Sequence, residues 1–283
     1  MTMKTILLPF YDDEASQRAF ELCARLIQPV GGYVEGLFIL RRPQILDSGE
    51  GDMLADSHFK ELEEESRRAA DRARMRFEAC AAEQGLAISA LTAADGPAVG
   101  WREIEGSEEY VIGSHGRLFE LIVIGRDFAR HWLNWRLLAE SALFESGRPV
   151  LLAPQTPVDV CCEKVIIAWN SSTETARTVA LSMPLLVRAR SVTVLSVEGW
   201  GVPGPTGAEL AAYLARTGVP ATPRTVAKDG RSPGERVLHE CARSGADLLV
   251  KGAYTQSRLR QLIFGGATRH IIAHAQLPVI LSN

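Results

Sequence analysis

No long apolar run occurs in this chain of 283 residues. Its apolar stretches are short, as at residues 121–124 and 279–281, and fall far below the roughly 18–20 residues that span a bilayer. The first residues also lack the extended apolar core of a secretory signal. We therefore expect a protein without a membrane segment.

Cysteine is scarce and follows no metal-binding or disulfide pattern. The five cysteines are Cys23, Cys80, Cys161, Cys162 and Cys241. Their number is odd and no C-x-x-C spacing occurs, which is typical of reduced thiols in a cytoplasmic protein. A cytoplasmic location is therefore expected.

Neither sign of charge dominates the composition. The chain carries 31 Lys and Arg against 34 Asp and Glu, for a net charge of −3 and a pI of about 6.1. No half carries the basic stripe that a phosphate backbone requires, so nucleic acid is not an expected partner. With 46% apolar residues the chain reads as an ordinary globular protein, and its length favours two domains.

Three landmarks occur twice in the same order, which indicates a duplicated domain. Residues 4–16 match 164–176 at an offset of 160, residues 121–125 match 248–252, and residues 149–152 match 278–281. A polar, Pro-containing stretch separates the two copies and suits a linker. We therefore predict domains over residues 1–155 and 162–283.

Strands and helices are expected to alternate within each copy. In the second copy, strand-like segments lie near residues 164–169, 191–197, 222–227, 247–252 and 277–282. Helical segments lie between them, with Ser172 and Ser232 as N-caps and helices over 207–216 and about 267–275. Buried strands separated by helices predict an α/β fold with a parallel, doubly wound sheet. Ligands of such sheets bind beyond the carboxyl ends of the strands, where the strand order reverses.

A glycine-rich segment follows the fourth strand of the second copy. Gly252 ends that strand, and Gly265 and Gly266 precede a helix whose free N–H groups and Thr268 hydroxyl can bind an anion. The alternative is that the glycine pair only forms a turn between two helices. Lys251 either reaches the phosphates of a ligand or extends to the edge of the sheet, and we favour the second.

The segment I-I-A-W-N-S-S at residues 166–172, with G-x2-T-x9-G-G-A-T at 252–268, resembles the universal stress protein family. The nucleotide-binding members of that family carry an Asp after the first strand and a G-x2-G-x9-G-[S/T] loop after the fourth. The resemblance implies a tandem protein whose halves are five-stranded, Rossmann-like domains. It also implies that the second half binds ATP or AMP, with or without Mg²⁺, and performs no catalysis.

Position by position, the resemblance implies a set of nucleotide-binding residues with three departures from the family pattern. Asn170 replaces the Asp, Thr255 replaces the second glycine, and Gly266 replaces the Ser or Thr. The implied nucleotide-binding residues are Ala168, Trp169, Asn170, Val197, Lys251, Gly252, Thr255, Gly265, Gly266, Ala267 and Thr268.

The first copy lacks most of this pattern. Phe10 stands where Asn170 stands in the second copy, and no glycine pair precedes the corresponding helix. We therefore expect the first copy to have a structural or interaction role. From the resemblance, the copies should pair through their last strands, residues 150–153 and 279–282, as a pseudo-dimer that can itself dimerise.

Two other function classes compete with a non-enzymatic, nucleotide-binding stress-response protein. The departures at the site leave open a protein-interaction module that binds no nucleotide. A slow ATP hydrolase is the weaker alternative, because the sequence shows no Walker loop and no nucleophile–base pattern. His270 and His274 are spaced like zinc ligands but have no third ligand nearby in sequence, so no metal site is expected.

The glycine-rich segment yields a first test. Gly265→Val should abolish nucleotide binding in a folded protein, because its side chain would occupy the space that phosphates need. Calorimetric titration with ATP measures this, and unchanged affinity in a folded variant would mean that the phosphate loop lies elsewhere.

Overall fold

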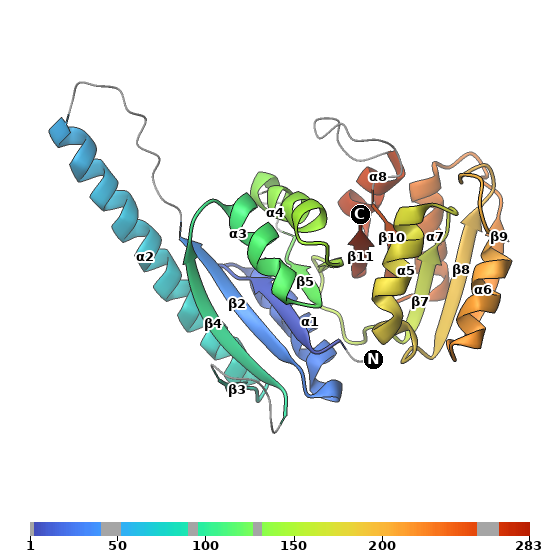
Figure 1. The fold of residues 1–283 in the computed structure, drawn as a ribbon, viewed down its shortest axis with the longest axis horizontal. Coiled ribbons are helices and arrows are strands. Elements are labelled where there is room, and N and C mark those ends of the chain that lie inside the picture. Colours follow the sequence, from blue (N-terminus) through green and yellow to red (C-terminus); the bar gives the residue numbers. More distant parts are fainter. Residues whose placement is uncertain (1–2, 41–51, 90–95, 127–131, 254–265) are drawn as a thin grey trace.

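The computed structural model describes residues 3–40, 52–89, 96–126, 132–253 and 266–283. Within these ranges the strands form an 11-stranded sheet in the order β3-β4-β2-β1-β5-β6-β11-β10-β7-β8-β9. The first half of the chain forms one end of this sheet and the second half the other (Figure 1). None of the described helices combines the length and the apolar character that a membrane crossing needs.

The first half alternates strands and helices as expected. Its elements are β1 (Thr5–Pro9), α1 (Glu14–Ile27), β2 (Tyr33–Leu40), α2 (Asp52–Glu83), β3 (Ala87–Ile88), β4 (Ala98–Glu105), α3 (Glu108–His115), β5 (Leu121–Ile124), α4 (Trp132–Glu145) and β6 (Val150–Leu152). The two-residue strand β3 at the outer edge makes this half six-stranded, which corrects the expectation of five.

The second half has the five strands that were expected, each within two residues of its predicted bounds. Its elements are β7 (Lys164–Ala168), α5 (Thr173–Leu186), β8 (Ser191–Val197), α6 (Gly207–Arg216), β9 (Ala221–Val226), α7 (Pro233–Ser244), β10 (Leu248–Gly252), α8 (Gly266–His274) and β11 (Val279–Ser282). The predicted caps are confirmed: the Ser172 side chain accepts the Thr175 N–H, and Ser232 forms a capping box with Glu235.

Both halves share the strand order of a doubly wound fold. Counting the five main strands of each half along the chain, the order is 3-2-1-4-5, so it reverses between β1 and β5 and between β7 and β10. Helices α1, α2, α5 and α6 cover one face of the sheet, and α3, α4, α7 and α8 cover the other. The prediction of two Rossmann-like, doubly wound domains is confirmed.

The two halves meet through their last strands. Strands β6 and β11 pair antiparallel, with Leu151 opposite Ile280, whereas the other described strand pairs are parallel. This pairing confirms the expected contact between residues 150–153 and 279–282 within one chain.

An acidic side chain before the fourth strand fixes the start of the first strand in each half. Glu120 accepts the Thr5 N–H at 3.0 Å, and Asp247 accepts the Lys164 N–H at 3.0 Å. Thr5 is therefore the counterpart of Lys164, and the repeat begins at an offset of 159 positions. The offset of 160 was wrong because it aligned Lys4 with Lys164 by identity, whereas hydrogen bonding sets the structural register.

This register also corrects the counterpart of Asn170. Tyr11 occupies the equivalent position in the first half, and Phe10 does not. The Phe10 ring is fully buried among Phe20 and Phe77, with edge-to-face centroid distances of 6.3 and 5.3 Å. Phe10 is thus a core residue of the first half.

Helix α2 carries a run of acidic and then basic residues over 61–74. Its buried residues Ala70, Ala73, Phe77 and Cys80 recur every three or four positions and face the sheet. Its other described face carries exposed ion pairs such as Arg68 with Glu64 at 2.7 Å. The acid–base pattern therefore does form a solvated helix face.

A buried arginine joins the two halves. Arg126, directly after β5, is 1% exposed and donates to the carbonyls of Ala153 at 2.8 Å, Ile272 at 2.8 Å and Ala275 at 2.7 Å. Two of these carbonyls belong to the last turn of α8 and the residue after it, where the helix dipole attracts a cation. Burial lowers the pKa of Arg126 to about 10, so the guanidinium stays charged at neutral pH.

Replacement of this side chain should weaken the whole fold. Arg126→Met leaves three buried carbonyls without this donor, and we expect the free energy of unfolding in urea to fall by about 3–5 kcal/mol. The matched control is Arg72→Met, because Arg72 is 57% exposed in an ion pair with Asp12 and its loss should cost at most about 1 kcal/mol. Equal losses in the two variants would contradict this role.

Candidate functional site

The predicted site lies at the carboxyl ends of β7, β8 and β10. Strand β7 pairs with both of the others, so the residues that follow the three strands share one edge of the sheet (Figure 1). Asn170 follows β7, Val197 ends β8, and Lys251 and Gly252 end β10. The structure thus brings together residues that lie far apart in the sequence.

Gly252 serves helix packing. A Cβ at this position would lie 2.7 Å from the Glu174 carbonyl carbon and would also clash with the Thr175 backbone nitrogen. The first turn of α5 therefore packs directly on the end of β10, and only glycine leaves room for it. Gly125 has the same role in the first half, where a Cβ would lie 2.7 Å from the Ala15 carbonyl carbon.

Asn170 is buried, and its side-chain oxygen is engaged by the start of α5. This oxygen accepts from the Thr175 hydroxyl at 2.6 Å and from the Ser172 N–H at 3.4 Å. An aspartate could accept from a ligand hydroxyl as well, whereas the amide group of Asn170 can only donate to one. The substitution therefore changes the polarity of the contact that this position offers.

The side chains of three predicted site residues lie in the core. Ala168, Trp169 and Val197 are buried, and the Trp169 indole N–H donates to the Pro205 carbonyl at 2.8 Å. The Val197 carbonyl accepts the Trp200 N–H at 3.1 Å, which closes the turn after β8. Contacts from these residues to a ligand would therefore come from the backbone.

Lys251 lies beneath α8. It is 4% exposed, and its ammonium donates to the Thr268 hydroxyl oxygen at 2.6 Å and to the Gly252 carbonyl at 2.8 Å. Its nitrogen also lies 6.0 Å from the centroid of the Trp200 ring, within the range of a cation–π contact. The expectation that Lys251 extends to the sheet edge is wrong, because strand alternation turns it toward the face that α8 covers.

Burial without a carboxylate acceptor makes this lysine unusual. Its two hydrogen-bond acceptors are neutral oxygens, and burial lowers its pKa to about 7. Thr268 is also buried, in the first turn of α8, and its own hydroxyl proton is free to point elsewhere because its oxygen accepts from Lys251. The cluster places a cation and a hydroxyl at the start of a helix.

The start of α8 carries a glycine. Among the described residues, nothing lies within 4 Å of a Cβ placed at Gly266, and Ala267 is half-buried. The first N–H groups of a helix have no partner within the helix, so those of residues 266–268 can donate to an anion. Thr255 and Gly265 lie outside the described residues.

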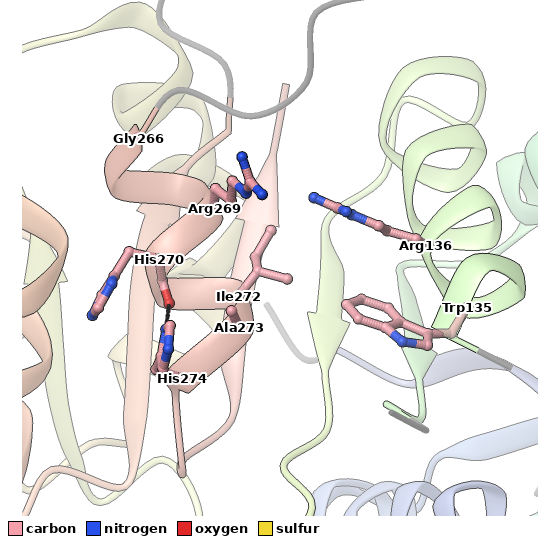
Figure 2. A pocket seen from close by; sticks show the side chains of 8 residues that line it. All are labelled: Trp135, Arg136, Gly266, Arg269, His270, Ile272, Ala273 and His274. Atoms are coloured by element: carbon pink, nitrogen blue, oxygen red, sulfur yellow. Dashed lines mark hydrogen bonds between the residues drawn. The ribbon is translucent and has the colours of Figure 1, made fainter. Parts of the chain in front are cut away.

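A cleft of about 370 Å³ separates α8 from α4 of the first half (Figure 2). It is lined by Trp135, Arg136, Gly266, Arg269, His270, Ile272, Ala273 and His274. The rings of His270 and His274 stack with centroids 4.2 Å apart. Within the described ranges, no three His, Cys, Asp or Glu side chains are grouped to hold a metal ion.

Side chains of the first half fill its equivalent site. Tyr11, the counterpart of Asn170, packs its ring on Phe38 with centroids 5.6 Å apart, and its hydroxyl donates to Glu108 at 3.4 Å. Its N–H donates to the Ser16 hydroxyl at 2.9 Å. The arrangement is consistent with the structural or interaction role expected of this half.

Cys161 and Cys162 lie between the halves as free thiols, with their sulfur atoms 3.2 Å apart. The hydrogen bond with the Cys161 thiol, together with burial, raises the pKa of Cys162 well above its usual value. Cys162 is therefore a poor nucleophile in the folded protein.

The buried lysine should make stability depend on pH. The unfolded chain keeps the Lys251 proton up to about pH 10.5, whereas the folded chain releases it from about pH 7. The unfolded state therefore binds more protons between these values, and the free energy of unfolding should rise with pH across that window. Lys251→Met should stabilise the protein at pH 6 by a few kcal/mol, and this gain should shrink toward pH 10. A gain that is constant from pH 6 to 10 in urea unfolding would contradict the buried, titrating lysine.

Comparison with known proteins finds a family match in the second half of the chain. Residues 187–282 match the model of the universal stress protein family. The stress response protein NhaX of Bacillus subtilis is 35% identical over 49 residues, which cover 17% of this chain and 30% of that relative. The match thus spans less than a third of this curated relative.

Solved structures extend the likeness to the whole chain. A universal stress protein from Archaeoglobus fulgidus superposes with a TM-score of 0.70 at 15% identity, covering 100% of this chain and 99% of its own. A putative universal stress protein from Pseudomonas aeruginosa has a TM-score of 0.51 at 14% identity and covers 99% and 93%. Residues 187–282 therefore resemble the universal stress protein family, and the full chain shares its fold with a universal stress protein of matching length.

Proposed function

We propose that this stress-response protein binds an adenine nucleotide, ATP or AMP, at the carboxyl edge of the sheet in its second half. The observation that carries the proposal is the buried ammonium of Lys251 against Thr268 in the first turn of α8. A buried cation with neutral acceptors is costly, and a nearby phosphate would lower that cost. The open N–H groups at the start of α8 favour the same anion.

The remaining groups of the site fit a nucleoside attached to that phosphate. The Asn170 amide group can donate to ribose oxygens while its carbonyl holds α5. The turn from Val197 to Trp200 brings backbone groups and an indole ring to the same edge, where a base can stack. Lys251 and Asn170 come from the two strands between which the order reverses.

Binding without catalysis suits this set of groups. The side chains of Asn170, Lys251 and Thr268 supply an amide, an ammonium and a hydroxyl at the described part of the site. These groups hold and neutralise phosphates. Binding with or without Mg²⁺ is therefore the function that we propose.

A second candidate is an interaction module that binds no nucleotide. One observation favours it: the Asn170 oxygen is already satisfied by Thr175 and Ser172, and the Lys251 ammonium by two oxygens. In this case the polar cluster stabilises the start of α5 and α8 and has no ligand.

Calorimetric titration with ATP and Mg²⁺ separates the two functions. The parent protein should bind about one nucleotide per chain, and Lys251→Met should weaken binding by at least about tenfold, because it removes a charge-assisted hydrogen bond. The control is Lys228→Met, since Lys228 is exposed and follows β9, the outermost strand of this half. Chromatography of the supernatant from denatured, freshly purified protein gives an independent count of bound nucleotide.

The absence of both bound nucleotide and titration heat in the parent protein would contradict nucleotide binding and favour the interaction module. Equal affinity in the parent and in folded Lys251→Met would show that the nucleotide binds away from this lysine.

A further inference from the structure

The stretch that joins the two halves carries two adjacent thiols. Cys161 and Cys162 lie between the end of β6 and the start of β7, and their sulfur atoms are 3.2 Å apart. A disulfide bond is about 2.05 Å long, so the two sulfur atoms need to approach by only about 1 Å to form one. The pair precedes the amino end of β7, whereas the proposed nucleotide site lies at its carboxyl end. The two sites are therefore independent.

The backbone at the second thiol is strained. Cys162 has a φ of +67°, in the left-handed region that favours glycine. Within the described ranges, only Ser171 and Asp229 share a positive φ among the residues other than glycine. A cysteine lacks the local hydrogen bonds that make this region accessible to asparagine and aspartate. Strain of this kind persists only where the surrounding structure imposes it, and it gathers at functional sites.

An acidic side chain imposes this conformation. The Asp247 carboxylate accepts the Glu163 N–H at 3.1 Å and the Lys164 N–H at 3.0 Å, and it accepts the Cys162 N–H as well. One side chain thus fixes three successive backbone groups that begin at the second thiol. Because the backbone is fixed, the two thiols are already held together, which lowers the entropy cost of joining them.

The geometry suits a bond between the two sulfur atoms better than a shared metal ion. Two thiolates on one tetrahedral zinc ion, each about 2.3 Å from the metal, lie about 3.8 Å apart. The sulfur atoms of Cys161 and Cys162 are closer together than that. Among the residues that the structure describes, no group of three His, Cys, Asp or Glu side chains could complete such a metal site.

The two thiols differ in exposure and in protonation. Cys161 is half-buried and is the thiol that a small oxidant reaches first, whereas Cys162 is 8% exposed. The hydrogen bond with Cys161 and burial raise the pKa of Cys162, so this thiol keeps its proton. Cys161 therefore suits the first attack on an oxidant, and Cys162 suits a second thiol that supplies both a sulfur and a proton.

We propose that Cys161 and Cys162 form a reversible disulfide with each other when a hydroperoxide oxidises the protein. The Cys161 thiolate attacks one peroxide oxygen and the O–O bond breaks. The other oxygen takes up a proton and leaves as water or an alcohol, so that Cys161 becomes a sulfenic acid. The Cys162 sulfur then attacks the Cys161 sulfur, and the sulfenic oxygen leaves as water with the Cys162 proton. The two thiols together give up two electrons, which reduce the hydroperoxide.

The product closes a small ring that contains the peptide bond between the two cysteines. A ring of this kind departs from ordinary disulfide geometry, and strained disulfides have higher reduction potentials. A thiol reductant should therefore restore the two thiols readily. The pair thus reports exposure to a hydroperoxide and returns to its starting state without repair of the chain.

The test treats the reduced, full-length protein with hydrogen peroxide, alkylates the remaining thiols and digests the chain with trypsin. The peptide over residues 137–164 contains both cysteines and no other one. It should escape alkylation and weigh two hydrogens less than the reduced peptide, while the free thiols of the chain fall from five to three. Dithiothreitol should reverse both changes. The reaction should precede any oxidation of the buried thiols Cys80 and Cys241.

Cysteine variants test the order of the two steps. Cys161→Ala should abolish the loss of two hydrogens, whereas Cys162→Ala should leave a sulfenic acid on Cys161 that dimedone captures. The matched control is Cys241→Ala, which removes another buried thiol of the second half and should leave the disulfide unchanged. The peptide map of the parent protein decides the question even where a variant fails to fold.

Cys23 provides the competing outcome. It is fully buried on α1 and lies near enough to Cys161 for their charges to interact. A disulfide between Cys23 and Cys161, or between two chains, would overturn the proposal. So would a peptide over 137–164 that gains oxygen without losing two hydrogens, or a pair that reacts no faster than Cys241. Disulfide formation only after denaturation in urea would assign the reaction to the unfolded chain and would also overturn it.

Discussion

The antiparallel pairing of β6 with β11, reinforced by Arg126, is the contact on which the arrangement of this molecule depends. Parallel strands build each half, but only this short pairing continues the sheet from one half to the other. Three residues on each strand supply few hydrogen bonds, so a buried guanidinium that binds one carbonyl of its own half and two of the other half strengthens the junction. The charge is tolerated because two of the acceptors lie at the negative end of α8.

Helix α8 is the element that links this junction to the proposed nucleotide site. Its end is held by Arg126, its inner face rests on Lys251 through Thr268, and its outer face carries Arg269 toward α4. The helix therefore takes part both in the junction and in the proposed nucleotide site. The burial of Lys251 lowers its pKa to about 7 and so reduces the stability of the fold near neutral pH. It also places a cation beside the start of α8, where the proposed site needs one.

Most of the fold could be predicted from the sequence, because strands and capped helices have local signals; α6 and α7, for example, begin and end where their caps and periodicity indicated. The register of the repeat is harder to predict, since Lys4 and Lys164 match by identity. The hydrogen bonds to Glu120 and Asp247 instead make Thr5 the counterpart of Lys164. The side chain of Lys251 points to the face of the sheet that α8 covers. No local sequence pattern tells which helix covers that face. Arg126 was missed because its acceptors in the second half lie 146 and 149 positions away in the sequence, which no local pattern reveals.

Hydrogen exchange at the junction tests most directly whether the two halves form one unit held by β6, β11 and Arg126. Peptides that contain Leu151 and Ile280 should exchange together, at the rate set by global unfolding, and should lose protection together in Arg126→Met. Exchange of the β11 peptide by local opening, while the β6 peptide keeps its full protection, would contradict a joint that couples the two halves.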